Sequence, residues 1–65
     1  MDATVKQLQD RLTRSPYSEL RGIQVHFEDG SIVLTGAVKS FYAKQLAQEA
    51  VRHNGTPVEN RLEVL

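Results

Sequence analysis

Residues 29–38, DGSIVLTGAV, decide most of the fold that this sequence encodes. The pair Asp29-Gly30 favours a two-residue type I′ turn, because both central positions of that turn require a positive φ. Residues 22–28 before the turn (GIQVHFE) alternate between apolar and polar side chains, and residues 31–38 after it form a largely apolar second strand. Such alternation is typical of strands with one buried face. The stretch therefore predicts a β-hairpin whose first strand turns three side chains to the core: Ile23, Val25 and Phe27.

Gly36 interrupts the second strand of this hairpin. A two-residue turn sets Val25 opposite Leu34 and Ile23 opposite Gly36, so the glycine stands where an apolar core residue is expected. We expect the missing side chain either to let a helix approach the sheet closely or to let the strand bend. A β-bulge at the same place is the alternative.

Two amphipathic helices and a last strand complete the pattern. Residues 2–14 are predicted to form a helix. The apolar side chains at helical spacing are Met1, Val5, Leu8 and Leu12, with Asp2 as the expected N-cap and Pro16 beyond the end. Residues 41–53 follow the N-cap Ser40, turn a face rich in alanine to the core and stop at Asn54-Gly55. The last strand begins at Pro57, where the missing N–H of proline does least harm.

The order is therefore α-β-β-α-β, an α+β fold with two helices on one face of a three-stranded mixed sheet. A helix connects the second strand to the third, which predicts that these two strands run parallel if they are neighbours. Whether the third strand lies beside the second or the first is left open by the sequence.

Composition narrows the function classes. The chain has 65 residues, so we expect one domain over residues 1–65, with little room for a cavity beside a core. Eight basic and eight acidic residues cancel, which argues against nucleic acid, since phosphate binding needs a basic excess. The absence of cysteine excludes disulfides and thiolate metal sites. No apolar run reaches the roughly 20 residues of a transmembrane helix.

The chain resembles the BON domain family (bacterial OsmY and nodulation) in three segments. These are GIQVHFEDGSIVLTGAV, the helix segment AKQLAQEAV and the closing NGTPVENRLEVL, which together cover nearly the whole chain. Thr56-Pro57 departs from the family pattern, which has a single apolar residue after the glycine. The difference falls in a loop and puts no core residue in doubt.

The resemblance implies a non-enzymatic module without a cofactor that binds phospholipid surfaces or partner proteins. It also implies a periplasmic or envelope-associated location if the chain is an excised domain, and a cytoplasmic one if it is the whole chain. Some family members respond to ions or osmotic stress. The oligomeric state is left open.

The first candidate contact lies at the start of the second helix. Phe41 falls on the polar side of that helix, and Tyr42 falls at the flank of the apolar stripe. Lys39 and Lys44 lie nearby in the sequence. Aromatic rings and lysine stems are both favourable at a lipid interface, so we expect these four residues to contact lipid or a partner. The alternative is that Phe41 folds back onto a neighbouring loop.

The second candidate contact is the outward face of the sheet. The alternation places Val33, Ala37 and His26 on that face, where they predict a weak docking patch for a protein partner or a second copy. A plain solvated sheet face is the alternative.

The remaining polar and glycine residues point to structure. Gly30, Gly36 and Gly55 serve the backbone, and we expect Asn60, a polar residue with inward parity, to bond a neighbouring main-chain group. His26 and His53 lie on different elements without metal-ligand spacing. The carboxylates form no local pair, so the sequence predicts neither a catalytic site nor a metal site.

Overall fold

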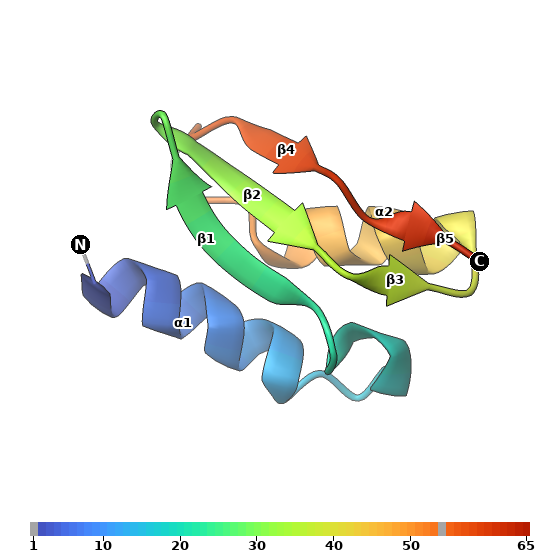
Figure 1. Ribbon diagram of the computed structural model, residues 1–65. Coiled ribbons are helices and arrows are strands. Elements are labelled where there is room, and N and C mark those ends of the chain that lie inside the picture. Colours follow the sequence, from blue (N-terminus) through green and yellow to red (C-terminus); the bar gives the residue numbers. More distant parts are fainter. Residues whose placement is uncertain (1, 54) are drawn as a thin grey trace.

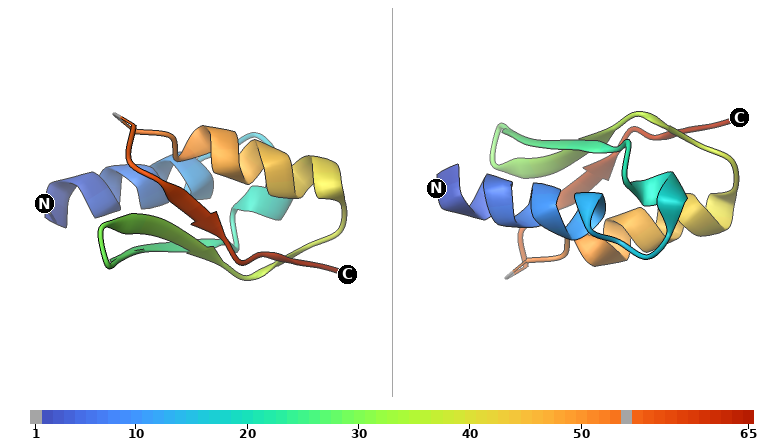
Figure 2. Two further views of the ribbon diagram at one scale, coloured as in Figure 1. Left: turned by 90° about the horizontal axis from the view of Figure 1, so that it is seen from above. Right: turned by 90° about the horizontal axis from the view of Figure 1, so that it is seen from below.

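The computed structural model describes residues 2–53 and 55–65, and for residues 2 and 3 it describes the main chain alone. Helix α1 (Asp2–Thr13) leads through the 3₁₀ helix η1 (Ser18–Leu20) to the hairpin strands β1 (Gln24–Glu28) and β2 (Ser31–Thr35). Then come β3 (Ala37–Val38), α2 (Phe41–Ala50), β4 (Val58–Asn60) and β5 (Glu63–Val64). The sheet forms one layer and the two helices form the other (Figures 1 and 2). The expected two-layer α+β fold is confirmed.

The third strand of the sequence pattern lies beside the second. Strand β2 sits between β1, which is antiparallel to it, and β4, which is parallel to it. Strands β3 and β5 form a second, parallel pair. The offset between partners is the same in both parallel ladders, since Leu34 pairs with Asn60 and Ala37 with Glu63. The two pairs are therefore one ladder that continues through a bend.

The bend, and not close packing, explains Gly36. Its φ of +131° is a conformation that residues with a side chain rarely adopt. A Cβ at this position would meet Ile23 and the carbonyl of Gly22 at 3.6 Å, an ordinary contact, and no helix atom is among its nearest neighbours. The expectation of a close helix approach is wrong, and the constant register argues against a bulge relative to β4 and β5.

The type I′ turn is present as expected, with Asp29 at φ 50° and Gly30 at φ 79°. Helix α2 ends at Ala50, three residues before the predicted end, and Gly55 follows with φ 73°. The expected roles of Met1, the Asp2 side chain and Asn54 lie outside the described residues.

The core lies between the layers and consists of residues from every larger element. Within this core cluster, the side chains buried most completely are Leu8, Leu12, Ile23, Ile32, Leu34, Val38, Ala47 and Val51. One expectation is wrong at its margin, because Phe27 is 41% exposed beside the hairpin turn. In the connector between α1 and β1, Leu20 is buried and Tyr17 is half exposed.

A side chain that the sequence analysis passed over closes part of the sheet edge. Strand β1 is an edge strand, and its outer side faces α1. The Gln9 amide donates to the carbonyl of Ile23 at 2.8 Å and accepts from the N–H of Val25 at 3.0 Å. Gln9 thus supplies β1 with the donor and acceptor that a neighbouring strand would supply, which satisfies two polar groups at an open edge.

Candidate contact surface

The candidate contact lies at one end of the molecule, where α2 begins. The Ser40 side chain accepts from the N–H of Ala43 at 3.1 Å, which is the N-cap that the sequence predicts. The Ser40 carbonyl accepts from the N–H of Lys44 at 3.2 Å, so the first turn is fixed from both sides. Ahead of the cap, the Glu19 carboxylate accepts from the N–H of Lys39 at 2.7 Å. The chain entering α2 is therefore held by η1 as well.

This fixed turn presents two aromatic side chains to solvent. Phe41 is 76% exposed and Tyr42 is 65% exposed, so Phe41 does not fold back onto a loop. Lys39 is exposed beside them and Lys44 is half-buried. We call these four residues the aromatic tip. Their exposure matches the sequence expectation, and binding by them is a matter for proposal.

Leu65 extends the apolar surface at this end of the molecule. Its N–H donates to the carbonyl of Val38 at 2.8 Å, which continues the parallel ladder to within two residues of Ser40. The side chain is 78% exposed. Figures 1 and 2 show this segment ending at the same end of the molecule as the start of α2, in the sheet layer.

Asn60 fastens α2 to the sheet behind the tip. Its side-chain nitrogen donates to the carbonyl of Lys44 at 3.0 Å and to Gln48 Oε1 at 3.3 Å. Its side-chain oxygen accepts from the N–H of Leu62 at 3.1 Å, across the bend between β4 and β5. The donors and the acceptor of this amide are all bonded within the protein, which is typical of a structural residue.

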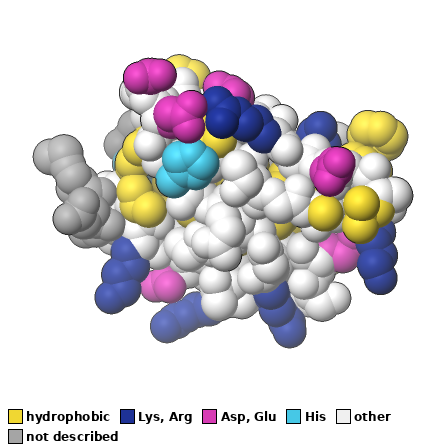
Figure 3. Space-filling model, in the orientation of Figure 1, with side chains coloured by type: hydrophobic (Ala, Val, Ile, Leu, Met, Phe, Trp, Pro, Cys, Tyr) yellow, Lys and Arg dark blue, Asp and Glu magenta, His cyan; other side chains and the backbone are white. Residues whose placement is uncertain are grey.

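Charged side chains occupy the outward sheet face, where the sequence predicted an apolar patch. Glu28 accepts from Arg61 at 2.9 Å and lies 3.2 Å from His26, and Arg61 also binds Glu59. Because Glu28 ends β1 and Arg61 follows β4, their contact crosses β2. Figure 3 shows the histidine with acidic and basic side chains gathered on this face.

Val33 lies beneath that network and is 0% exposed. Its strand neighbours on this face are His26 and Glu59. The expectation that Val33 is accessible is therefore wrong, because long side chains from both neighbouring strands cover it. Ala37 is exposed and His26 is partly exposed, but Val33, the centre of the expected apolar patch, is not accessible.

The network shifts the pKa of two of its members. Hydrogen bonds from Arg61 and then from His26 hold the pKa of the Glu28 carboxyl below its usual range. The hydrogen bonds that Arg61 donates, to Glu59 first and to Glu28 second, raise the pKa of its guanidinium. These groups are at the surface, where charge pairs contribute little to stability.

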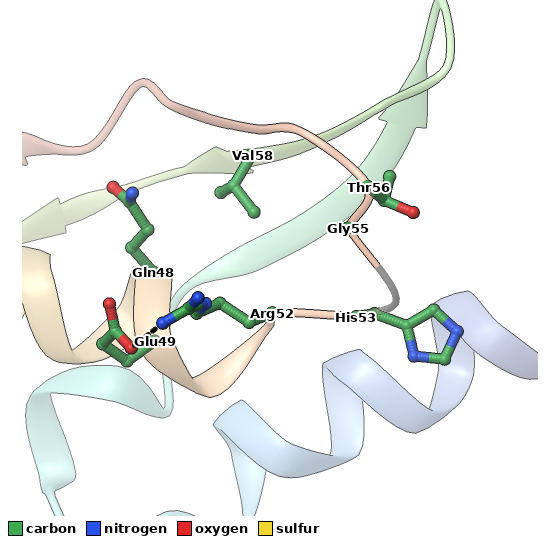
Figure 4. A pocket seen from close by; sticks show the side chains of 7 residues that line it. All are labelled: Gln48, Glu49, Arg52, His53, Gly55, Thr56 and Val58. Atoms are coloured by element: carbon green, nitrogen blue, oxygen red, sulfur yellow. Dashed lines mark hydrogen bonds and ion pairs between the residues drawn. The ribbon is translucent and has the colours of Figure 1, made fainter.

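The described part of the surface also has hollows, which sequence reasoning missed, and two of them stand out. One, of about 480 Å³, lies between the end of α2 and the start of β4, where Arg52 reaches back to Glu49 at 2.9 Å (Figure 4). The other is an open groove at the hairpin end, lined among others by Val5, Phe27 and His53. The first is lined by residues 48–58 alone, whereas the second combines three segments that are distant in the sequence.

The described residues restrict the chemistry further. Neither helix has the length and apolar run that crossing a bilayer requires, judged over the described part of the chain. Over the same part, no three His, Asp or Glu side chains come together as metal ligands would.

The fold and the surface define a small α+β domain with an exposed aromatic end. The family model for the BON domain matches residues 2–65, essentially the whole chain, and the protein belongs to that family. BON domains are non-catalytic binding domains that occur in periplasmic or envelope proteins. Neither the curated proteins nor the solved structures contain a significant match to the chain.

Proposed function

We propose that this domain is a non-enzymatic module that attaches to a phospholipid membrane surface through the aromatic tip. The observation that carries the proposal is the exposure of Phe41 and Tyr42 on a turn whose backbone is fixed. Membership of the BON family supports the same function, since the family is known for phospholipid binding.

The physical chemistry of the tip suits a lipid interface. Aromatic rings are stable at the boundary between headgroups and acyl chains, and lysine stems can lie along apolar surface while their ammonium groups stay in water. Burying one phenyl ring contributes about 1.5–3 kcal/mol. Because Ser40 and Glu19 already order the turn, insertion costs little conformational entropy.

The proposed setting is the cell envelope, where members of the family occur. An envelope protein with an apolar, acidic surface would meet the same side chains and is the other partner that the tip fits. Docking through the outward sheet face is the weaker candidate, since Val33 is covered there.

The experiment is a vesicle titration of the wild-type domain and the variant Phe41→Ser, with phosphatidylglycerol–phosphatidylcholine and pure phosphatidylcholine vesicles. We expect the substitution to weaken binding by at least about tenfold, the equivalent of burying one ring. Amide resonances of residues 39–45 should broaden or shift on binding.

Phe27→Ser is the matched control, because it removes a partly exposed phenyl ring at the hairpin end of the molecule. It should leave vesicle affinity unchanged, and urea unfolding would confirm that both variants are folded. Equal affinity of wild type and Phe41→Ser would overturn the assignment of the tip. A wild-type domain that binds no vesicle would overturn the lipid function and direct the search to an envelope protein.

A further inference from the structure

The neutral net charge conceals a separation of charge between the two layers. The helices and their connectors, residues 2–23 and 39–57, hold seven basic and four acidic residues, a balance of +3. The strands and hairpin turn, residues 24–38 and 58–65, hold one basic and four acidic residues, a balance of −3. The molecule is therefore a dipole whose positive side is the helix layer.

Two basic side chains at α1 are exposed to solvent. They are Lys6, within the helix, and Arg14, directly after its end, whereas Leu8 and Leu12 of the helix are buried in the core. In Figure 3, which faces the sheet, dark-blue side chains project along the lower rim, on the side where Figure 1 shows α1. In both views of Figure 2 the two helices lie on the same side of the sheet.

Several cations of this layer are not committed to carboxylates. Among the described residues, three of the four ion pairs belong to the sheet-face network, and the fourth joins Arg52 to Glu49. Arg11 is used within the layer, since it donates to the carbonyl of Ala50. Lys6 and Arg14 take part in none of these bonds.

We propose that the helix layer, and not the sheet, faces an anionic phospholipid surface, with Lys6 of α1 and Arg14 directly after that helix contacting headgroups while the aromatic tip inserts. This inference rests on the proposed function and deepens it, because it names the lipid charge and the orientation of the domain. The attraction has two parts: the helix layer is drawn to negative headgroups, and the acidic sheet is repelled from them. The sheet face therefore stays turned to the aqueous side.

The decisive comparison uses two double variants that change net charge equally. Lys6→Gln/Arg14→Gln removes two charges from the helix layer. Gln24→Glu/Ala37→Glu adds two negative charges to exposed positions in the sheet layer. A basic residue near an anionic surface is worth roughly a fivefold change in affinity. At about 0.1 M salt, charges farther apart than roughly 10 Å are screened from each other. Under this condition, the effect of the layer that carries a charge can be distinguished from the effect of net charge.

We expect Lys6→Gln/Arg14→Gln to bind phosphatidylglycerol-containing vesicles at least about tenfold more weakly, and Gln24→Glu/Ala37→Glu less than about threefold more weakly. A paramagnetic lipid should broaden amides of α1 and spare those of β1. Equal losses in the two double variants would overturn the orientation, as would an unchanged Lys6→Gln/Arg14→Gln.

The orientation and the proposed function fail differently. If Phe41→Ser loses vesicle affinity while Lys6→Gln/Arg14→Gln keeps it, the tip binds lipid and the orientation is overturned. If the wild-type domain binds neither kind of vesicle, the proposed function is overturned together with the orientation.

Discussion

The Asn60 side chain donates to the main-chain carbonyl of Lys44 at 3.0 Å, and through this bond the edge strand β4 holds the first half of α2. The same side chain accepts from the N–H of Leu62, so one amide ties the helix to the bend of the parallel ladder. The exposed aromatic tip therefore stands on a helix that is fixed at its cap by Ser40 and farther along by Asn60. Because the helix is already fixed, the aromatic tip loses less conformational entropy on binding.

Replacing Asn60 with alanine should lower the free energy of unfolding by about 1–3 kcal/mol, because the Leu62 N–H and the Lys44 carbonyl lose their partner. Urea unfolding measures this effect. Gln48→Ala removes the longer 3.3 Å contact alone and should cost much less. If the two variants lose the same amount, Asn60 has no special role in the bend.

The hairpin shows how much of the fold could be predicted from sequence. The Asp29-Gly30 turn and the alternation around it fixed the pairing of Val25 with Leu34, which the structure confirms. The prediction succeeded because turn type and side-chain period are both local properties. The position of β4 beside β2 could not be predicted, because it depends on contacts between distant segments.

Gly36 shows where local reasoning stopped. Its place on the strand was predicted, but the cause lies in a bend shared by two strands. Val33 was expected on an open face, because strand alternation assigns a residue to one face of the sheet. It does not show whether neighbouring side chains cover that residue. The contact between Glu28 and Arg61 that crosses it joins residues 33 positions apart. The role of Gln9 was missed because its main-chain partners, Ile23 and Val25, are also distant in the sequence.

Replacing Gly36 with alanine should destabilise the domain by about 1–3 kcal/mol, because its φ of +131° is strained for any residue with a side chain. Gly22→Ala is the matched control, since a Cβ there meets nothing within 4 Å and the φ lies outside the positive range. That control should change stability by less than about 1 kcal/mol. Thermal unfolding of both variants measures the difference, and equal stability would disprove the bend as the cause.

Replacing Gln9 with alanine should cost about 1–2 kcal/mol and expose the edge of β1, because two main-chain groups lose their partner. Hydrogen exchange of the Val25 amide should accelerate more than that of amides paired with β2. Gln7→Ala, at an exposed position of the same helix, should change neither quantity. Unchanged exchange at Val25 would show that the Gln9 bond is not formed in solution.

The candidate site was only partly predictable. Helical spacing placed Phe41 on the polar side of α2, and the structure shows it exposed. The charge separation between the two layers was not predicted, because the fold decides which segments share a layer. The sequence lists every charged residue, but its net charge of zero does not show how these charges are distributed.

The surface network gives the domain a pH dependence whose sign follows from Glu28. Its pKa lies below the ordinary value of 4.5 in the folded state, chiefly through hydrogen bonds from Arg61. A depressed carboxyl pKa contributes stability that is present above the unfolded pKa and is lost as pH falls through the folded pKa. The advantage of wild type over Glu28→Gln should therefore be full near neutral pH and shrink below about pH 4.5.

Carbon-13 NMR titration of the Glu28 carboxyl measures the same effect directly. Its midpoint should lie below 4.5 in the wild type and move up toward that value in Arg61→Gln, because the main hydrogen-bond donor is removed. Glu63→Gln, elsewhere on the sheet strands, should leave the midpoint where it is. A Glu28 midpoint that does not respond to Arg61→Gln would show that the ion pair across β2 does not persist in solution, and Val33 should then become accessible.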